Sequence, residues 1–330
     1  MFSSHLLEID PRQAVDEIVA AIRAQVLGTL RRRGCVIALS GGIDSSVVAC
    51  VCVEALGRGG VLGLIMPERD SSSDALRLGH LLADHLEIQT IVEDITPILS
   101  AAGCYRRQAE AIRLVFPGYA EGYRCKITLP SILDRERLNV AHLTIETPDG
   151  QRRTARMPLS TNLQLVAATN FKQRTRAMMV YYHADRLNFA AAGTPNRLEY
   201  DQGFFVKQGD GAADFKPIAH LYKTQVYALA EYLGVPEEIR TRPPTTDTFS
   251  MPQTQEEFYF ALPYDKMDLC LYGRNHDVPP ATVAAGAGLT PEQVERVYRD
   301  IDQKRRTTRY LHAAPMLVKP VEEITPACAE

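Results

Sequence analysis

The sequence predicts an α/β protein built on a doubly wound, Rossmann-like parallel sheet, and three observations support this fold class. Short apolar runs rich in β-branched residues recur along the first hundred residues. Stretches with apolar residues at helical spacing separate these runs. The first run ends in "SGGIDSS", a turn that leads directly into a helical stretch. Strands that alternate with helices of this length form parallel sheets with helices on both faces.

The first predicted helix begins at Pro11. Asp10 precedes it as a candidate N-cap, and Gln13 stands where a capping box places its second side chain. Apolar residues then recur at helical spacing up to Leu30, and Gly34 is expected to end the helix.

Strands and helices are expected to alternate after this helix. The predicted strands are the apolar segments 35–40, 60–66, 88–94 and 187–193. The predicted helices are 45–56, 71–86, 161–184, 220–234 and 290–306. The first predicted strand, 35–40, is a short and continuously apolar run, which is typical of a strand buried on both faces of a parallel sheet.

The segment of about residues 105–157 is interpreted as an insertion into a single domain that spans 1–330. Alternating residues on either side of Asp149-Gly150 predict a β-hairpin within it. After Gly234, proline and polar residues accumulate over 239–257, which predicts a loop or lid.

Composition favours small-molecule chemistry in the cytoplasm. The net charge of −3 offers no broad field that would attract nucleic acid or an anionic membrane. No run approaches the roughly 20 apolar residues of a membrane span, and the first residues lack a secretory pattern. The seven cysteines are scattered without a CxxC pair, which argues against a disulfide framework or a zinc site.

The turn "SGGIDSS" has the properties of a phosphate-binding loop. A strand that turns through two glycines into a helix directs backbone N–H groups and the helix dipole at a bound anion. Asp44 would repel a bare phosphate, so its presence suggests a bridging Mg²⁺. The loop lacks the lysine and spacing of a Walker A motif. A plain Gly-Gly turn with a capping aspartate is the structural alternative.

With its serines, this turn resembles the SGG-x-DS signature of the ATP pyrophosphatases, which cleave ATP between the α and β phosphates. Further motifs resemble the NAD synthase family, in family order: "NFKQRTR", "GT-x-N-x-x-E", "GFF-x-K-x-GDGAAD" and "PTTD". The resemblance covers 34–94 and 170–248. It implies an adenine nucleotide alpha hydrolase-type fold and a ligase that makes NAD, AMP and pyrophosphate from deamido-NAD, ATP and ammonia.

The resemblance also implies roles for individual residues. Asp44 and Lys223 would be catalytic, and Asp44 and Glu199 would bind Mg²⁺. The implied ATP-binding residues are Ser40, Gly41, Gly42, Ile43, Asp44, Ser45, Ser46, Thr194, Lys223 and Thr245. The implied contacts to deamido-NAD are Arg174, Lys207, Asp214 and Lys304. The family further implies a homodimer.

Taken singly, several of these residues have an ordinary explanation. Lys223 and Glu199 would be solvated charges, and Lys172, Arg174 and Arg176 would form a basic helix face. Only the occurrence of all these residues together, within the motifs and in family order, favours a nucleotide-binding site. No histidine or Cys-His pair is indicated as catalytic, and the residues that contact adenine stay unassigned.

Two other functions remain open. The first is a related adenylating amidotransferase that acts on a different carboxylate, which the unmatched insertion allows. The second is a non-catalytic nucleotide-binding module, for which the Asp44 and Glu199 pair would be unnecessary. No glutaminase domain is recognised, so either free ammonia or a separate glutaminase would supply nitrogen.

Overall fold

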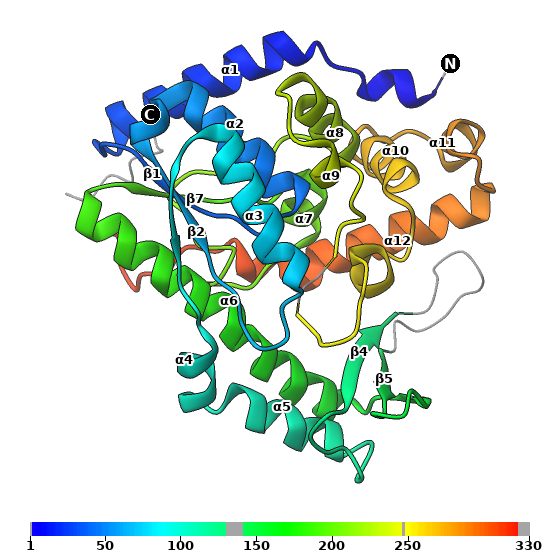
Figure 1. Ribbon diagram of the computed structural model, residues 1–330. Helices are drawn as coiled ribbons and strands as arrows, with labels where there is room; N and C mark the ends of the chain where they lie inside the picture. Colours follow the sequence, from blue (N-terminus) through cyan, green and yellow to red (C-terminus); the bar gives the residue numbers. More distant parts are fainter. Residues whose placement is uncertain (1, 130–140, 246–247, 323–330) are drawn as a thin grey trace.

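The computed structural model describes residues 2–129, 141–245 and 248–322, and a parallel sheet of four strands lies at its centre (Figure 1). The strands are β1 (Cys35–Ala38), β2 (Val61–Ile65), β3 (Gln89–Val92) and β7 (Ala190–Ala192). Their order in the sheet is β3-β2-β1-β7, so β1 pairs with both β2 and β7. All four are strands that the sequence predicted.

Helices cover both faces of the sheet, which confirms the doubly wound α/β prediction. Ile37 on β1 belongs to a core shared with α1, α2, α3 and α8, whereas its neighbour Val36 packs into a second core with α4, α5 and α6. The helices around the sheet are α1 (Pro11–Arg23), α2 (Ile43–Leu56), α3 (Ser73–Leu86), α4 (Thr96–Ala101), α5 (Cys104–Arg113), α6 (Leu159–Leu187) and α8 (Lys223–Tyr232).

The start of the first helix is as predicted, but its capping box and its end are not. Asp10 accepts hydrogen bonds from the backbone N–H groups of Arg12 (2.9 Å) and Gln13 (3.2 Å). The Gln13 side chain instead donates to Glu17 (2.8 Å), one helical turn along, so it does not complete a capping box. The helix passes at Arg23 into a π-helical segment, Ala24–Thr29, and stops before Gly34.

The predicted hairpin is present as β5 (His142–Glu146) and β6 (Arg152–Arg156), and it belongs to a larger unit. A strand that was not predicted, β4 (Arg124–Thr128), pairs with β5 and completes an antiparallel sheet of three strands. Side chains from β4, β5 and α5 share a small core with Phe249. The part of the predicted insertion at 130–140 lies outside the described residues.

The chain after Gly234 forms a helical layer beside the sheet, and the loop predicted at 239–257 overlaps the end of one short helix and the start of another (Figure 1). The helix predicted at 290–306 is confirmed, and Thr290 caps its first turn. The C-terminal helices share a core with Leu198 and Tyr222. The short helix α7 (Arg197–Gln202) comes before this part, whose elements are α9 (Glu237–Arg240), the π-helical Glu256–Phe260, α10 (Tyr264–Asn275), α11 (Pro280–Ala287) and α12 (Pro291–Thr308). Three short 3₁₀ segments are Ser4–Leu7, Arg58–Gly60 and Arg309–Leu311.

Candidate active site

The glycine turn after β1 has a backbone that its glycines make possible. Gly41 has φ +72°, and a Cβ there would lie 2.9 Å from both the Ala75 carbonyl oxygen and Leu78 Cβ. Gly42 is the N-cap of α2 and brings no side chain to cap it. The first N–H groups of α2 are therefore available to an anion at the carboxyl edge of the sheet.

The serines of this turn brace the loop internally. The hydroxyls of Ser45 and Ser46 both donate to the Gly42 carbonyl oxygen at 2.9 Å. The hydroxyls of Ser40 and Ser45 lie 3.1 Å apart. Ser46 is fully buried, so its contribution is to hold the loop rather than to reach a ligand.

Two carboxylates and one lysine from three separate helices meet at this turn. Asp44 in the first turn of α2 forms an ion pair with Lys223, the first residue of α8, and accepts a hydrogen bond from the Asn196 side chain (2.9 Å). Asn196 also caps α7, and its backbone N–H donates to the Glu199 carboxylate (3.1 Å). Gln255 donates to the second oxygen of Glu199 at 3.1 Å. One buried asparagine thus positions both carboxylates.

Burial and mutual repulsion control the protonation of this group. Desolvation, together with the nearby Asp44 carboxylate, raises the pKa of Glu199 to about 8. Burial lowers the pKa of Lys223, but the carboxylates of Asp44 and Glu199 outweigh that effect and leave the pKa above its ordinary value. The surroundings therefore favour the charged form of Lys223 and the protonated form of Glu199.

These groups border a cavity of about 600 Å³ at the carboxyl ends of β1, β2 and β7. Eight of the predicted site residues line it: Ser40, Gly42, Ile43, Asp44, Ser45, Thr194, Glu199 and Thr245. Lys223 reaches the same place through its ion pair with Asp44. Thr246 and Asp247 of the predicted "PTTD" motif lie outside the described residues.

The four residues that the resemblance assigned to the dinucleotide are placed elsewhere. Arg174 is exposed on α6 and donates to the Lys207 carbonyl oxygen (3.3 Å). The Lys207 ammonium donates to the carbonyl oxygens of Tyr310 (2.8 Å) and Ala313 (3.1 Å). Asp214 accepts a hydrogen bond from the Ala191 backbone N–H of β7 at 2.7 Å.

Lys304 is buried within α12. Its ammonium lies 2.7 Å from the Asp300 carboxylate and donates to the Tyr259 carbonyl oxygen at 2.8 Å. Burial lowers the pKa of Lys304, although Asp300 opposes the shift. In this arrangement the side chain secures α12 to the segment that carries Tyr259.

Several residues of the site were missed by sequence reasoning. The sequence does contain a signal for Asn196, because Asn-x-x-Glu is a capping-box pattern. Asn196 and Glu199 form this capping box at the start of α7. Asp268 accepts the backbone N–H groups of Lys223 (3.2 Å) and Thr224 (2.8 Å) and so anchors the start of α8; burial raises its pKa to about 6. Gln255 lies in a segment without periodic pattern, so no signal indicated it.

The interpretation of Lys172 as part of a basic helix face is wrong. Its side chain is fully buried and its ammonium lies between two carboxylates. Arg174 on the same helix is exposed, and Arg176 lines the cavity.

The carboxylate pair suits a hard divalent cation. Asp44 and Glu199 offer oxygen ligands at one end of the cavity, and Mg²⁺ is commonly held by one or two carboxylates together with substrate phosphates and water. Within 2–129, 141–245 and 248–322, no cluster of three or more His, Cys, Asp or Glu side chains has the arrangement of a complete protein-only metal site. The donor set therefore fits a cation that arrives with a phosphate ligand.

Comparison with known proteins identifies the family of this architecture. The family model described as NAD synthase matches residues 14–116 and 135–310. The unmatched stretch between them, 117–134, lies inside the predicted insertion. The chain is 63% identical to the NH(3)-dependent NAD(+) synthetase of Mesorhizobium japonicum, over 94% of this chain and 98% of the relative. It is 57% identical to the protein of that name from Rhizobium meliloti, over 98% and 97%.

A solved structure shows the same fold at low identity. The NH3-dependent NAD synthetase of Campylobacter jejuni is 22% identical and aligns with a TM-score of 0.62, over 94% of this chain and all of the other. Among the helices that the structure describes, none combines the length and apolarity needed to span a bilayer.

Proposed function

Because the chain belongs to the NAD synthase family, we propose that it catalyses the ATP-dependent amidation of deamido-NAD to NAD with ammonia. The observation that carries this proposal is the 63% identity to an NH(3)-dependent NAD(+) synthetase over almost the whole of both chains. In this reaction the substrate carboxylate attacks the α-phosphate of ATP, and pyrophosphate leaves. Ammonia then attacks the acyl carbon of the adenylate, and AMP leaves with the bonding electron pair as the amide forms.

We assign the phosphates of ATP to the turn between β1 and α2. The N–H groups at the start of α2 would stabilise charge on the departing pyrophosphate, and the braced loop of Ser40, Gly41, Gly42, Ser45 and Ser46 keeps them in place. Lys223 would supply a positive charge to the phosphates, while Thr245 and Thr194 would contact the nucleotide from other walls of the cavity. Catalysis of the first step is then mainly positioning and charge neutralisation.

We assign Mg²⁺ to Asp44 and Glu199. When bound there, the ion would neutralise phosphate charge during the transfer of AMP. The shared contact of both carboxylates with Asn196 supports this assignment, because it fixes their relative orientation before a ligand arrives.

We retain Arg174, Lys207, Asp214 and Lys304 as proposed contacts to deamido-NAD. Arg174 is exposed, so a phosphate or carboxylate can reach it without rearrangement. Lys207 would have to exchange its two carbonyl partners for the substrate. At Lys304 substrate binding would require breaking the ion pair with Asp300.

We further propose a cytoplasmic homodimer that uses free ammonia or ammonia from a separate glutaminase. Apolar side chains exposed on α6 support the dimer, among them Leu159 (73% exposed) and Leu163 (60%). The six cysteines of the described ranges are all buried and free, which suits a reducing compartment.

The test is product analysis of the purified chain with ATP, Mg²⁺, deamido-NAD and either ammonium or glutamine. We expect NAD from ammonium alone, with AMP and pyrophosphate in equal amounts, and no NAD from glutamine alone. Nicotinate mononucleotide, offered in place of deamido-NAD, tests for a different acyl substrate. Amidation of the mononucleotide but not of deamido-NAD would overturn the proposed substrate, and binding of ATP without any amide product would favour a non-catalytic module.

A further inference from the structure

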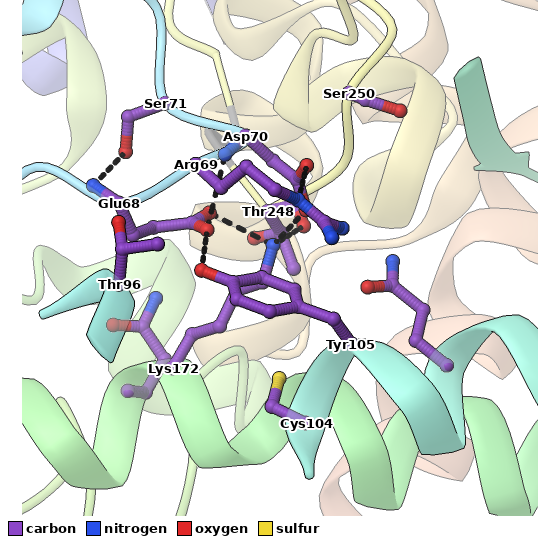
Figure 2. A network of polar contacts seen from close by, with 12 residues as sticks. Glu68, Arg69, Asp70, Ser71, Thr96, Cys104, Tyr105, Lys172, Thr248 and Ser250 are labelled. Atoms are coloured by element: carbon purple, nitrogen blue, oxygen red, sulfur yellow. Dashed lines mark hydrogen bonds and ion pairs between the residues drawn. The ribbon is translucent and has the colours of Figure 1, made fainter. Parts of the chain in front are cut away.

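A buried ion cluster lies behind the wall of the cavity, with Lys172 of α6 at its centre (Figure 2). The Lys172 ammonium lies 2.8 Å from a Glu68 oxygen, 2.7 Å from an Asp70 oxygen and 2.8 Å from the carbonyl oxygen of Thr248. An ammonium has three donors, and these three acceptors use all of them. The lysine thereby joins α6, the segment after β2 and the segment that precedes α10.

Two more side chains complete the cluster (Figure 2). Tyr105 of α5 donates its hydroxyl to the second oxygen of Glu68 at 2.8 Å. Arg69 donates to Asp70 at 3.1 Å, and its guanidinium carbon lies 3.7 Å from the centre of the Tyr105 ring. Burial favours the neutral form of Asp70, but Lys172 and Arg69 overcome this effect and lower its pKa. Two carboxylates are thus balanced by two cations.

The cluster holds three walls of the cavity at a fixed separation. Pro67 and Ser71, which flank the two acids, both line the cavity, and so does Thr248 itself. Thr169 and Gln173, on either side of Lys172 along α6, line it as well. Among the described residues that line the cavity, Glu68, Asp70 and Lys172 do not appear, so they act on a ligand through their neighbours.

A second contact spans the same two segments at the cavity itself. The Arg242 guanidinium lies 3.2 Å from the Ser72 hydroxyl and 3.3 Å from the Thr245 hydroxyl. Thr245 is one of the proposed phosphate contacts, and it lies three residues before Thr248. Thr248 also lines the cavity, so a displacement of its carbonyl oxygen would change the shape of the wall near that contact.

We infer that Lys172 is a positioning residue for ATP: it binds the Thr248 carbonyl and sets the distance between Thr248, which lines the cavity, and the segment after β2. Apolar packing could hold these segments together at lower cost, because desolvating several charges is expensive. Unlike apolar packing, the Lys172 ammonium makes a directional hydrogen bond, and this bond fixes the position of the Thr248 carbonyl oxygen. This inference rests on the proposed binding of ATP in the cavity, and it does not require that the acyl substrate be deamido-NAD.

The test must separate positioning from stability, because Lys172→Met alone leaves two buried carboxylates with one cation. The double variant Glu68→Gln/Lys172→Met restores the charge balance and keeps the ion pair between Arg69 and Asp70. Tyr105→Phe is the matched control: it removes one hydrogen bond of Glu68 and leaves the contact of Lys172 with Thr248 intact. Each variant is compared with the wild-type full chain by thermal melting, by ATP binding in a calorimeter, and by KM for ATP and for deamido-NAD.

We expect the double variant to melt near the wild-type temperature and to bind ATP about tenfold more weakly, the effect of losing one hydrogen bond to a charged group. Its KM for deamido-NAD should stay within about twofold of wild type, since the proposed dinucleotide contacts lie elsewhere. Tyr105→Phe should lower the melting temperature without changing ATP affinity. Asp70→Asn replaces one of the two carboxylates around Lys172 by a neutral amide and should weaken ATP binding about threefold, which provides a measurement if the double variant does not fold.

Wild-type ATP affinity in both the double variant and Asp70→Asn would overturn the inference, as would equal losses for ATP and deamido-NAD. Calorimetric binding of ATP needs no turnover. If the wild-type chain binds ATP but makes no NAD, the proposed function fails while the role of Lys172 is still decided by the binding data.

Discussion

Replacement of Glu199 by glutamine should stabilise the ligand-free protein, and only above a certain pH. The pKa of Glu199 is raised from 4.5 to about 8 by burial and by Asp44. Below 4.5 the carboxyl is protonated in both the folded and the unfolded chain. Between 4.5 and 8 the unfolded chain releases the proton while the folded chain keeps it, so the free energy of unfolding falls as the pH rises, and it levels off above 8. Glutamine has no proton to release and avoids this loss.

The size of the effect follows from the shift. A rise of the pKa from 4.5 to about 8, at roughly 1.36 kcal/mol per pKa unit, would lower the free energy of unfolding by at most roughly 5 kcal/mol. Glu199 keeps partial access to the cavity, and solvent reduces the cost, so we expect on the order of 2–3 kcal/mol. At about 2 °C per kcal/mol for a chain of this size, the melting temperature of Glu199→Gln should exceed that of wild type by about 5 °C at pH 8.5.

The assay is thermal melting of both proteins in EDTA without nucleotide, at pH 5, 7 and 8.5. The difference between them should be small at pH 5 and should grow toward pH 8.5, while Glu199→Gln loses Mg²⁺-dependent NAD synthesis. Glu231→Gln, the same change at an exposed position of α8, should show a constant difference. If Glu199→Gln is less stable by the same amount at every pH, then Glu199 is ionised beside Lys223 and the reasoning is refuted.

Three further changes test the loop, the carboxylate and the exposed face of α6. Asp44→Asn should reduce NAD formation by about 10²–10³-fold in steady-state assays, because it removes one of the two proposed carboxylate ligands of the Mg²⁺ that would neutralise phosphate charge; a smaller loss would exclude Asp44 from the site. Gly41→Ala should lower the melting temperature and abolish ATP binding, since φ is +72° and the new Cβ would contact Ala75. Gly59→Ala, with nothing within 4 Å, is its control. Leu163→Glu should halve the mass measured by light scattering, whereas Leu114→Glu, equally exposed on another element, should not; unchanged mass would exclude α6 from the interface.

The parallel sheet and the glycine turn after its first strand could be predicted because their signals are local. A strand such as Cys35–Ala38 is buried on both faces, so its sequence is continuously apolar. The turn that follows needs a left-handed residue and a cap without a side chain, and Gly41-Gly42 supplies both. The strand Arg124–Thr128 also had a signal, since Cys125 and Ile127 are buried between more exposed neighbours, but two charged residues and a length of five hid the alternation.

The environment of Lys172 could not be predicted, because its partners are distant in the sequence. Glu68 lies 104 residues away and Thr248 lies 76 residues away. Within its own helix Lys172 is followed by Arg174 and Arg176, and a local reading assigns all three to solvent. These contacts between distant residues depend on how α6 lies against the sheet. The pattern of apolar residues within each segment does not indicate that arrangement.

In the proposed site, the charges around Asp44 would let the protein stay folded before ATP binds and still attract a cation with its phosphates. With Glu199 protonated, the ion pair of Asp44 and Lys223 leaves no unbalanced charge among these three side chains. A divalent cation bound here would favour the ionised carboxylate, so Glu199 would release its proton to solvent, and the ammonium of Lys223 would be free to turn from Asp44 to the phosphates. Below about pH 8 this exchange releases a proton, so the heat of Mg²⁺·ATP binding should vary with the ionisation enthalpy of the buffer. In Glu199→Gln that buffer dependence should disappear, whereas a heat that is independent of buffer in the wild-type protein would show that Glu199 is already ionised.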